Sequence, residues 1–414
     1  MQFKTVVLLT GLATASLAWA IEDPYLWLEG IDDEKALDWV RAENASTAER
    51  LKSSPLFDEL YSEAKTILNS KSRLPDVYQE GDWLYNFWRD QKNPRGVFRR
   101  TTLDGLASDK PDWEVVIDID ALSKKENQQW VFKGMSCLMK QPEHCLVRLS
   151  PGGGDAVVSR EFNSVSKRFV KDGFYLPVAK GSASWIDADT LFVSTDFGEG
   201  SMTDSGYPRI VKRWKRGTPL SSAELIYEGE VSSVSANAFR LHSAGEDIDL
   251  VRDGLTFWTS EHFQLIDGKT QGLELPVSAV VNGAFQGRLI FSLKEDWTRA
   301  DTTYRQGSVL IADTTALHAG GKGVIDILIE PDDTTVVESV NTTDTTVLIT
   351  VLDNVRSRIY RFTPGTEGRW ERALVDFPDN GSLQITSTDD ATGNFFAHYE
   401  SFTSPPTLYH VCLL

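Results

Sequence analysis

Basic residues and sulfur-containing residues are scarce in this chain. Its 414 residues include 42 lysines and arginines against 60 aspartates and glutamates, which gives a formal net charge of −18. Nucleic acids and anionic membrane surfaces are bound by clustered positive charge, so the composition argues against both classes of partner. Only three cysteines are present, and their spacing matches no pattern of zinc ligands. We expect no metal and no cofactor.

Long apolar runs are missing after the first twenty residues. A membrane-spanning helix needs about 20 consecutive apolar residues, and no later stretch reaches that length. Residues 1–20 have the features of a signal peptide: Lys4 supplies positive charge, residues 6–12 form a short apolar core, and Ala18 and Ala20 fit the cleavage rule. The alternative is a buried N-terminal helix. We predict cleavage after Ala20 and a secreted, extracellular protein.

Secretion permits disulfides and glycosylation. Cys137 and Cys145 flank a turn-like segment between two strand-like runs, so we predict a disulfide between them and a free Cys412. Three Asn-x-Ser/Thr sequons are candidate glycosylation sites: Asn44, Asn341 and Asn380. The alternative for each is an unused sequon.

The motifs of common catalytic sites are absent from the sequence. A serine hydrolase places its nucleophile in a Gly-x-Ser-x-Gly elbow, and the nearest match, Ser136 within residues 134–138, lacks the final glycine. None of the histidines forms a metal-type pair, and we interpret each as a surface or hydrogen-bonded side chain. The six are His144, His242, His262, His318, His398 and His410. We predict no catalytic residue in this chain.

Three other clusters have plain structural explanations. The aspartate pairs at positions 118 and 120 and at 332 and 333 lack the repeated spacing of a calcium loop, so we interpret them as solvated turn residues. No helix pattern follows the glycines at 152–154, which favours a turn between strands over a phosphate cradle. The basic run at 212–216 fits one strand with solvated charges.

Two helices are predicted near the N-terminus. Apolar residues recur at helical spacing within residues 33–52, and a second tract starts after Pro55. In this second tract one apolar stripe contains Leu56, Leu60, Ala64, Ile67 and Leu68. Such a stripe needs a surface that covers it.

From about residue 81 to the C-terminus, short strand-like runs alternate with turn residues. So many short strands are typical of a propeller, a β-helix or a pair of sandwiches. Residues 82–414 divided among seven blades give about 48 residues for each, within the range for four-stranded blades, although six or eight blades also fit. The expected fold class is all-β.

Several strings, taken together and in this order, resemble the prolyl oligopeptidase family of serine peptidases. They lie at residues 23–29, 130–134, 145–150, 160–162, 195–198, 205–209, 214–217 and 401–409. The resemblance implies a seven-bladed propeller over residues 81–414, which follows a signal peptide at 1–20 and a helical segment at 21–80. In that family an α/β-hydrolase domain follows the propeller. The nucleophile, acid and base of that domain have no counterparts in this sequence.

Three functions are compatible with these observations. The resemblance implies the substrate-gating propeller of a peptidase for proline-containing peptides, catalytically incomplete as this chain, with an α/β-hydrolase domain as the missing partner. A stand-alone secreted propeller that binds a peptide or glycan is the second. One half of a split peptidase is the third. The apolar stripe after Pro55 favours the first and the third, because a stand-alone binder should have polar helices.

Overall fold

The computed structural model describes residues 23–70, 73–108 and 110–413. The chain divides into two units, Met1–Ser70 and Lys71–Leu414. The signal peptide predicted for residues 1–20 lies outside the described residues. The expected boundary at residue 80 comes about ten residues too late, because β1 (Tyr78–Glu80) already belongs to the second unit. None of the described helices is both long and apolar enough to cross a membrane.

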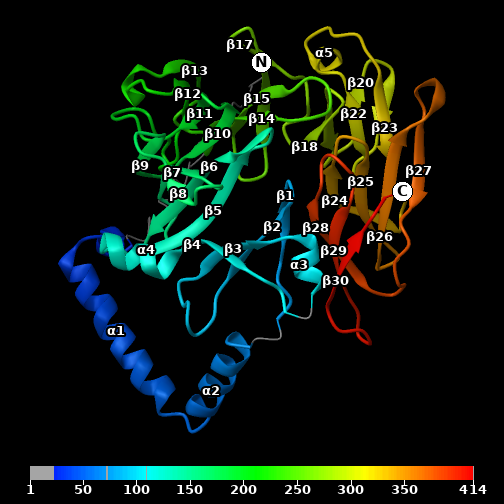
Figure 1. Cartoon of the computed structure of the whole chain (residues 1–414). Helices are drawn as coiled ribbons and strands as arrows, with labels where there is room; N and C mark the ends of the chain where they lie inside the picture. The colour runs from blue at the N-terminus through cyan, green and yellow to red at the C-terminus, as the bar shows by residue number, and fades with distance from the viewer. Residues whose placement is uncertain (1–22, 71–72, 109, 414) are drawn as a thin grey trace, which may run out of the picture. The chain divides into compact units, whose positions relative to one another are not determined.

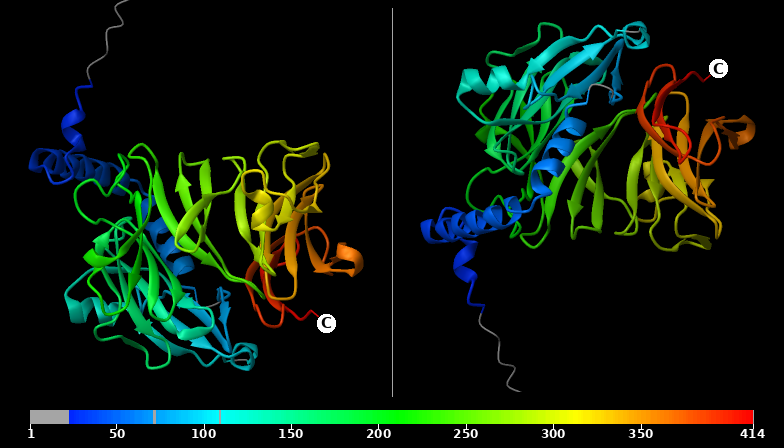
Figure 2. Two further views of the ribbon diagram at one scale, coloured as in Figure 1. Left: turned by 90° about the horizontal axis from the view of Figure 1, so that it is seen from above. Right: turned by 90° about the horizontal axis from the view of Figure 1, so that it is seen from below.

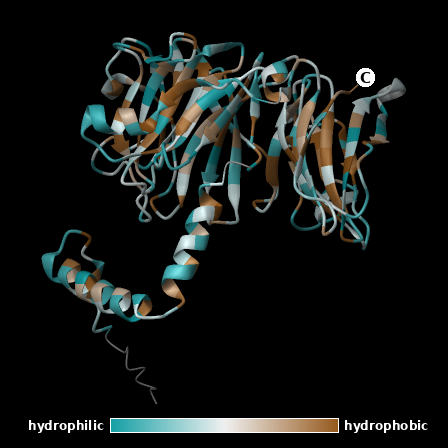
Figure 3. Cartoon of the chain, turned by 60° about the horizontal axis from the view of Figure 1, so that its bottom comes forward, coloured by the Kyte–Doolittle hydropathy of each residue, from teal (hydrophilic) through white to brown (hydrophobic). Residues whose placement is uncertain are grey.

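The first unit is helical, as predicted. It contains η1 (Leu26–Glu29), α1 (Glu34–Lys52) and α2 (Phe57–Leu68). Asp33 caps α1, since its carboxylate accepts a hydrogen bond from the backbone N–H of Ala36 at 2.9 Å. No residue of α2 is buried, and Leu60 and Ile67 remain 58% and 64% exposed. Apolar and polar bands alternate along both helices in Figure 3.

The second unit consists of antiparallel sheets that follow one another in chain order around a ring (Figure 1). Blade 1 contains β1, β2 (Trp83–Trp88), β3 (Val97–Thr101) and β4 (Glu114–Asp118). Blade 2 contains β5 (Trp130–Leu138), β6 (Gln141–Pro151), β7 (Val157–Asn163), β8 (Arg168–Phe169) and β9 (Tyr175–Ala179). Blade 3 contains β10 (Ser182–Asp187), β11 (Thr190–Ser194), β12 (Ile210–Lys215) and β13 (Glu224–Glu228).

The remaining blades have the same meander order. Blade 4 contains β14 (Ser235–Leu241), β15 (Ile248–Gly254), β16 (Ser260–Ile266) and β17 (Lys269–Gly272). Blade 5 contains β18 (Val280–Phe285), β19 (Arg288–Ser292), β22 (Val309–Ala312) and β23 (Ile325–Ile329), with the hairpin β20 (Trp297–Arg299) and β21 (Thr302–Tyr304) inserted. Blade 6 contains β24 (Thr335–Thr342), β25 (Val347–Asp353), β26 (Arg356–Pro364) and β27 (Trp370–Leu374). Blade 7 contains β28 (Ser382–Thr388), β29 (Phe395–Glu400) and β30 (Thr407–Val411).

The sheets therefore form a seven-bladed β-propeller, as the resemblance implied. The first strands of neighbouring blades contact one another and surround the central axis. Blade 1 lies beside blade 7, so the ring closes between the cyan and the red sheets in Figure 2. A blade cannot bury both of its faces alone, so each depends on its neighbours.

The apolar core is divided among the interfaces between blades. Each of the seven clusters of buried side chains includes residues of two adjacent blades. The interface between blades 4 and 5 buries twelve residues, whereas the interface between blades 7 and 1 buries only Val77, Leu84 and Phe396. Because burial of apolar area stabilises a fold in proportion to that area, the closing interface gains the least from fully buried apolar side chains among the described residues.

The structure differs from the predicted elements in three respects. Helices interrupt the strands at α3 (Leu103–Ala107), α4 (Ile119–Glu126) and α5 (Thr314–Leu317), with 3₁₀ turns η2 (Leu220–Ser222) and η3 (Thr366–Gly368). The strands β10, β14 and β18 are inner strands that the hydrophobic pattern did not predict. Residues 255–259, one of the short strand-like runs expected after residue 81, form the loop between β15 and β16.

Candidate functional site: the upper face and the channel mouths

The two faces of the propeller have different loops. We call the face at which the first strand of each blade begins the upper face, and the face at which it ends the lower face. The chain enters blade 1 at the upper face, at Val77. Because strands alternate in direction, the loops between second and third strands also lie on the upper face.

Large apolar side chains are exposed at the tips of three upper loops. Phe257 and Trp258 are 83% and 89% exposed between β15 and β16 in blade 4. Val355 in blade 6 and Phe402 in blade 7 occupy the same kind of loop and are exposed as well. Exposed apolar groups that gather on one face of a protein indicate an interaction surface. The upper face is therefore the candidate binding face.

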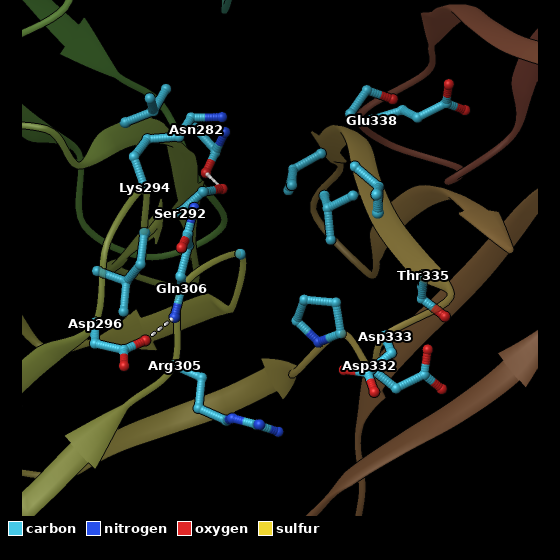
Figure 4. Close-up of a pocket in the computed structure, with 18 residues that line it drawn as sticks. Asn282, Ser292, Lys294, Asp296, Arg305, Gln306, Asp332, Asp333, Thr335 and Glu338 are labelled. Carbon is cyan, nitrogen blue, oxygen red and sulfur yellow. Dashed lines mark hydrogen bonds between the residues drawn. The ribbon is translucent and has the colours of Figure 1, made fainter.

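A groove of about 620 Å³ opens between blades 5 and 6 (Figure 4). Asn282, Ser292 and Lys294 form its blade 5 wall, while Asp332 and Glu338 lie across from them. Positive and negative side chains thus face one another across the groove. Such a lining suits a polar chain with hydrogen-bonding groups along its length, as a peptide has.

The polar side chains of this groove are already held in place. The Ser292 hydroxyl donates to Oδ1 of Asn282 at 2.5 Å, and the backbone N–H of Gln306 donates to Oδ1 of Asp296 at 2.7 Å. The N–H and hydroxyl groups of Thr334 donate to Asp332 and hold the pKa of its carboxyl below the usual range. No histidine or cysteine lines the groove within the described residues, so this groove has binding groups without a nucleophile and base.

Carboxylates gather at the lower mouth of the central channel, which is the space around the ring axis. A pocket of about 420 Å³ there is lined by Glu80, Asp344, Asp389 and Asp390, together with Lys140. Burial and the charge of Asp390 raise the pKa of Glu80 to about 7. Burial and the charges of Asp344 and Asp389 raise the pKa of Asp390 to about 6. At neutral pH the lower mouth therefore holds negative charge that is only partly developed.

The predicted site residues are dispersed over the propeller. Ser136 lies in β5, with Leu146 opposite it in β6, so its setting is a strand rather than a strand-to-helix elbow. No three metal-ligating side chains lie close together within the described residues. Four histidines contact a polar partner or a ring: His144 with Glu161, His242 with Asp247, His318 with Gln264, and His398 with Asp76. His410 stacks on Phe396.

His262 is the most buried of the six, and for it the interpretation as a surface or hydrogen-bonded histidine is wrong. It is 5% exposed, and its Nδ1 atom has no hydrogen-bond partner among the described residues. It lines a pocket of about 560 Å³ between blades 4 and 5, below Phe257 and Trp258. A histidine in an apolar strand pattern gives no sequence signal that separates this arrangement from an ordinary core position.

The structure joins Cys137 and Cys145 in a disulfide, and Cys412 is free and exposed. The two bonded cysteines face each other in the register of β5 and β6. Asn44 is exposed on α1 and Asn380 is exposed before β28, so both positions suit a glycan. Asn341 is half-buried on β24, a first strand, so it suits a glycan less well.

Comparisons with known proteins agree with this architecture. The family model described as the prolyl oligopeptidase N-terminal beta-propeller domain matches residues 15–413. The uncharacterized peptidase y4nA of Sinorhizobium fredii is 35% identical over 400 residues, which are 94% of this chain and 54% of the relative. The uncharacterized peptidase RP174 of Rickettsia prowazekii is 28% identical over 401 residues and is covered to 55%. The chain thus spans about half the length of these curated relatives.

Solved structures show the same correspondence. A post-proline cleaving enzyme from Rickettsia typhi superposes with a TM-score of 0.87 at 27% identity, over 93% of this chain and 58% of that one. Oligopeptidase B from Leishmania major superposes with a TM-score of 0.70 at 15% identity, over 94% of this chain and 54% of that one. At 15% identity, the likeness to oligopeptidase B shows only that the fold is shared.

Proposed function

Since the chain belongs to the prolyl oligopeptidase family, as its N-terminal propeller part, we propose that it is the substrate-gating half of a secreted serine peptidase. The catalytic half is an α/β-hydrolase domain that docks on the upper face. The chain by itself is catalytically incomplete.

The observation that carries this proposal is that the upper face exposes apolar side chains while the described residues contain no catalytic set. Phe257, Trp258, Val355 and Phe402 expose apolar surface at loop tips around one face, as an interface without its partner does. Within the described residues no serine, histidine and acid come together as a catalytic set. A partner that supplies the chemistry explains both facts.

The architecture of a propeller supports the gating role. A ring of blades over an active site admits an extended peptide and excludes a folded protein, and it also keeps bulk water from the reacting groups. The Rickettsia typhi relative is described as a post-proline cleaving enzyme. We therefore infer that proline-containing peptides are the substrates of the complete enzyme.

A fluorophosphonate probe tests this proposal, because it labels the activated serine of a hydrolase. We expect the mature chain of residues 21–414 to remain unlabelled and to leave a proline-containing chromogenic peptide uncleaved. We expect the protein encoded by the whole transcript to be labelled at one serine in a Gly-x-Ser-x-Gly motif beyond codon 414. Labelling of a serine within residues 21–414 that is lost when this serine is mutated contradicts the proposal.

A second candidate is a propeller that binds peptides without a catalytic partner. The groove between blades 5 and 6 favours it, since Asn282, Ser292 and Asp332 are held in place by bonds within the propeller itself. A transcript that ends at codon 414, with a chain that stays monomeric at high concentration, would favour this candidate over the first.

A further inference from the structure

The pocket between blades 4 and 5 contains a buried imidazole with an unused hydrogen-bonding atom. His262 lies in β16 and is 5% exposed, and its Nδ1 atom is buried without a hydrogen-bond partner within the described part of the chain. Burial and the neighbouring Arg252 lower the pKa of His262 to about 4, so the ring is neutral at pH 7. A neutral imidazole has one donor and one acceptor. A buried polar group without a partner is costly and points to a ligand.

Two cations accompany this imidazole. Arg252 in β15 is directly opposite His262 in the register of the sheet, so their side chains lie on the same face. Lys294, in the loop after β19, lines both this pocket and the groove between blades 5 and 6. Neither Arg252 nor Lys294 forms an ion pair with a carboxylate among the described residues, although the chain has an excess of 18 negative charges. Two unpaired cations and one imidazole N–H suit a carboxylate.

Apart from three hydroxyl side chains, the rest of the pocket is apolar. Phe239 of β14 forms one wall, and Phe257 and Trp258 stand at the rim. The loop that carries these two aromatic residues is fixed, since the backbone N–H of Leu255 donates to the carbonyl of Thr259 at 3.0 Å. Aromatic side chains exposed on a fixed loop offer a flat surface to an apolar group at little cost in conformational entropy.

We propose that the pocket between blades 4 and 5 binds a peptide carboxylate next to an apolar side chain. Arg252, His262 and Lys294 bind the carboxylate, and Phe239 and Trp258 contact the apolar group. The carboxylate belongs either to the C-terminus of a peptide that ends in an apolar residue or to an acidic side chain followed by one. The pocket thus gives the propeller its own preference among peptides. This inference rests on the proposed function only for the statement that the ligand is a peptide.

Three small probes separate charge from apolar contact and terminal from side-chain carboxylate. N-acetylphenylalanine has both groups, N-acetylphenylalaninamide lacks only the charge, and the amidated dipeptide acetyl-aspartyl-phenylalaninamide moves the carboxylate to a side chain. We titrate each into the mature chain at pH 7 and low salt in a calorimeter. We expect N-acetylphenylalanine to bind at least about tenfold more tightly than its amide, and the result with the dipeptide decides between the two sources of carboxylate.

Variants assign the binding to the named residues. We expect Arg252→Gln to reduce the affinity for the acid to that for the amide, and Trp258→Ser to weaken both probes by a similar factor. Lys294→Gln replaces an exposed side chain that folding does not need, and we expect it to weaken only the acid, about threefold. Arg148→Gln and Lys215→Gln, at exposed positions in blades 2 and 3, are matched controls that should change nothing.

The titration of His262 gives a second readout. A carboxylate bound beside the ring should raise the pKa of His262, whereas the amide should leave it near 4, and histidine NMR signals report the difference. Equal affinities for acid and amide, or an acid affinity that Arg252→Gln leaves unchanged, would overturn the proposal. Neither result bears on the hydrolase partner, because the titrations use the mature chain without it. Conversely, labelling of the chain by a fluorophosphonate would contradict the proposed function but not the binding of a carboxylate in this pocket.

Discussion

The backbone N–H of Gln79 in blade 1 donates a hydrogen bond of 2.7 Å to the hydroxyl of Ser387 in blade 7. The two residues are 308 positions apart, and this bond joins the first strand of the ring to the first strand of its last blade. The Gln79 side chain also donates to Asp389 at 3.2 Å. Polar contacts thus supplement the small apolar core formed by Val77, Leu84 and Phe396.

Removal of the Ser387 hydroxyl should therefore weaken the closure of the ring. We expect Ser387→Ala to lower the free energy of unfolding by about 1 kcal/mol and to speed hydrogen exchange at the Gln79 amide. Ser382→Ala, at an exposed position on the same strand, is the control for urea unfolding and exchange measurements. Equal effects of the two substitutions would show that the bond from Gln79 to Ser387 does not stabilise the closure of the ring.

The ion pair between Glu161 and Arg216 should be a major support of the interface between blades 2 and 3. Nη1 and Nη2 of Arg216 donate to the buried Glu161 carboxylate, at 2.7 and 3.0 Å, and the Phe174 N–H donates to it at 2.8 Å. Loss of one partner of a buried pair is costly, so we expect Glu161→Gln to destabilise the propeller by about 3 kcal/mol in urea unfolding.

The exposed pair of Arg213 and Glu224 in blade 3 is the matched control, and Glu224→Gln should cost less than about 1 kcal/mol, since solvent screens this pair. Burial favours a higher pKa for Glu161, but the hydrogen bonds from Arg216 and Phe174 outweigh it and hold that pKa below the usual range. The stabilisation from this pair is therefore present above the pKa of an unfolded glutamate and is lost as the pH falls below it. A wild-type advantage over Glu161→Gln that does not shrink in acid would contradict this assignment.

Stability should also depend on pH through Glu80 at the lower channel mouth. Its pKa rises from 4.5 to about 7 in the folded chain, so the unfolded chain loses its proton first and stability falls as the pH rises between these values. We expect Glu80→Gln to be more stable than the wild type by roughly 1–3 kcal/mol at pH 8 and equally stable near pH 4. Glu371→Gln, on the exposed β27, should show no such dependence in the same urea titrations.

The Cys137–Cys145 disulfide should stabilise the propeller modestly, because it closes a short loop. In the chain-entropy model a loop of this size contributes about 2–3 kcal/mol. We expect the double variant Cys137→Ser, Cys145→Ser to lose that amount in urea unfolding, and Cys412→Ser to lose none. Peptide mapping without reduction should recover Cys137 and Cys145 in one linked fragment and Cys412 as an alkylated thiol; two free thiols from an oxidising compartment would refute the bond.

The apolar stripe on α2 should make the chain associate. Leu60 and Ile67 are more than half exposed, and a contiguous apolar patch drives association. We expect Leu60→Glu with Ile67→Glu to shift the chain toward monomer in sedimentation at high concentration, whereas Glu63→Gln on the same helix should not. Limited proteolysis should cut first between residues 20 and 81; if that segment resists protease as well as the blades do, the stripe has no missing partner.

The sequence by itself determined the elements that depend on local pattern. The helical spacing of apolar residues within 33–52 and the start signal at Pro55 predicted α1 and α2, and short strand-like runs separated by turn residues predicted most of the outer strands. The sequence strings also identified the family and hence the number of blades, which the length alone left open. These features could be predicted because capping, turn chemistry and burial of one strand face act over a few residues.

The tertiary structure alone decided the inner strands and the sites. The strands β10, β14 and β18 face the ring axis and mix small or polar residues with apolar ones, so their pattern is weak. The run at 255–259 has the composition of a strand but forms a surface loop in which Phe257 and Trp258 are exposed. The opposition of Arg252 and His262 and the bond from Gln79 to Ser387 depend on strand register and ring closure. Those contacts exist only once distant segments pack, because burial and loop closure set them and no local pattern encodes them.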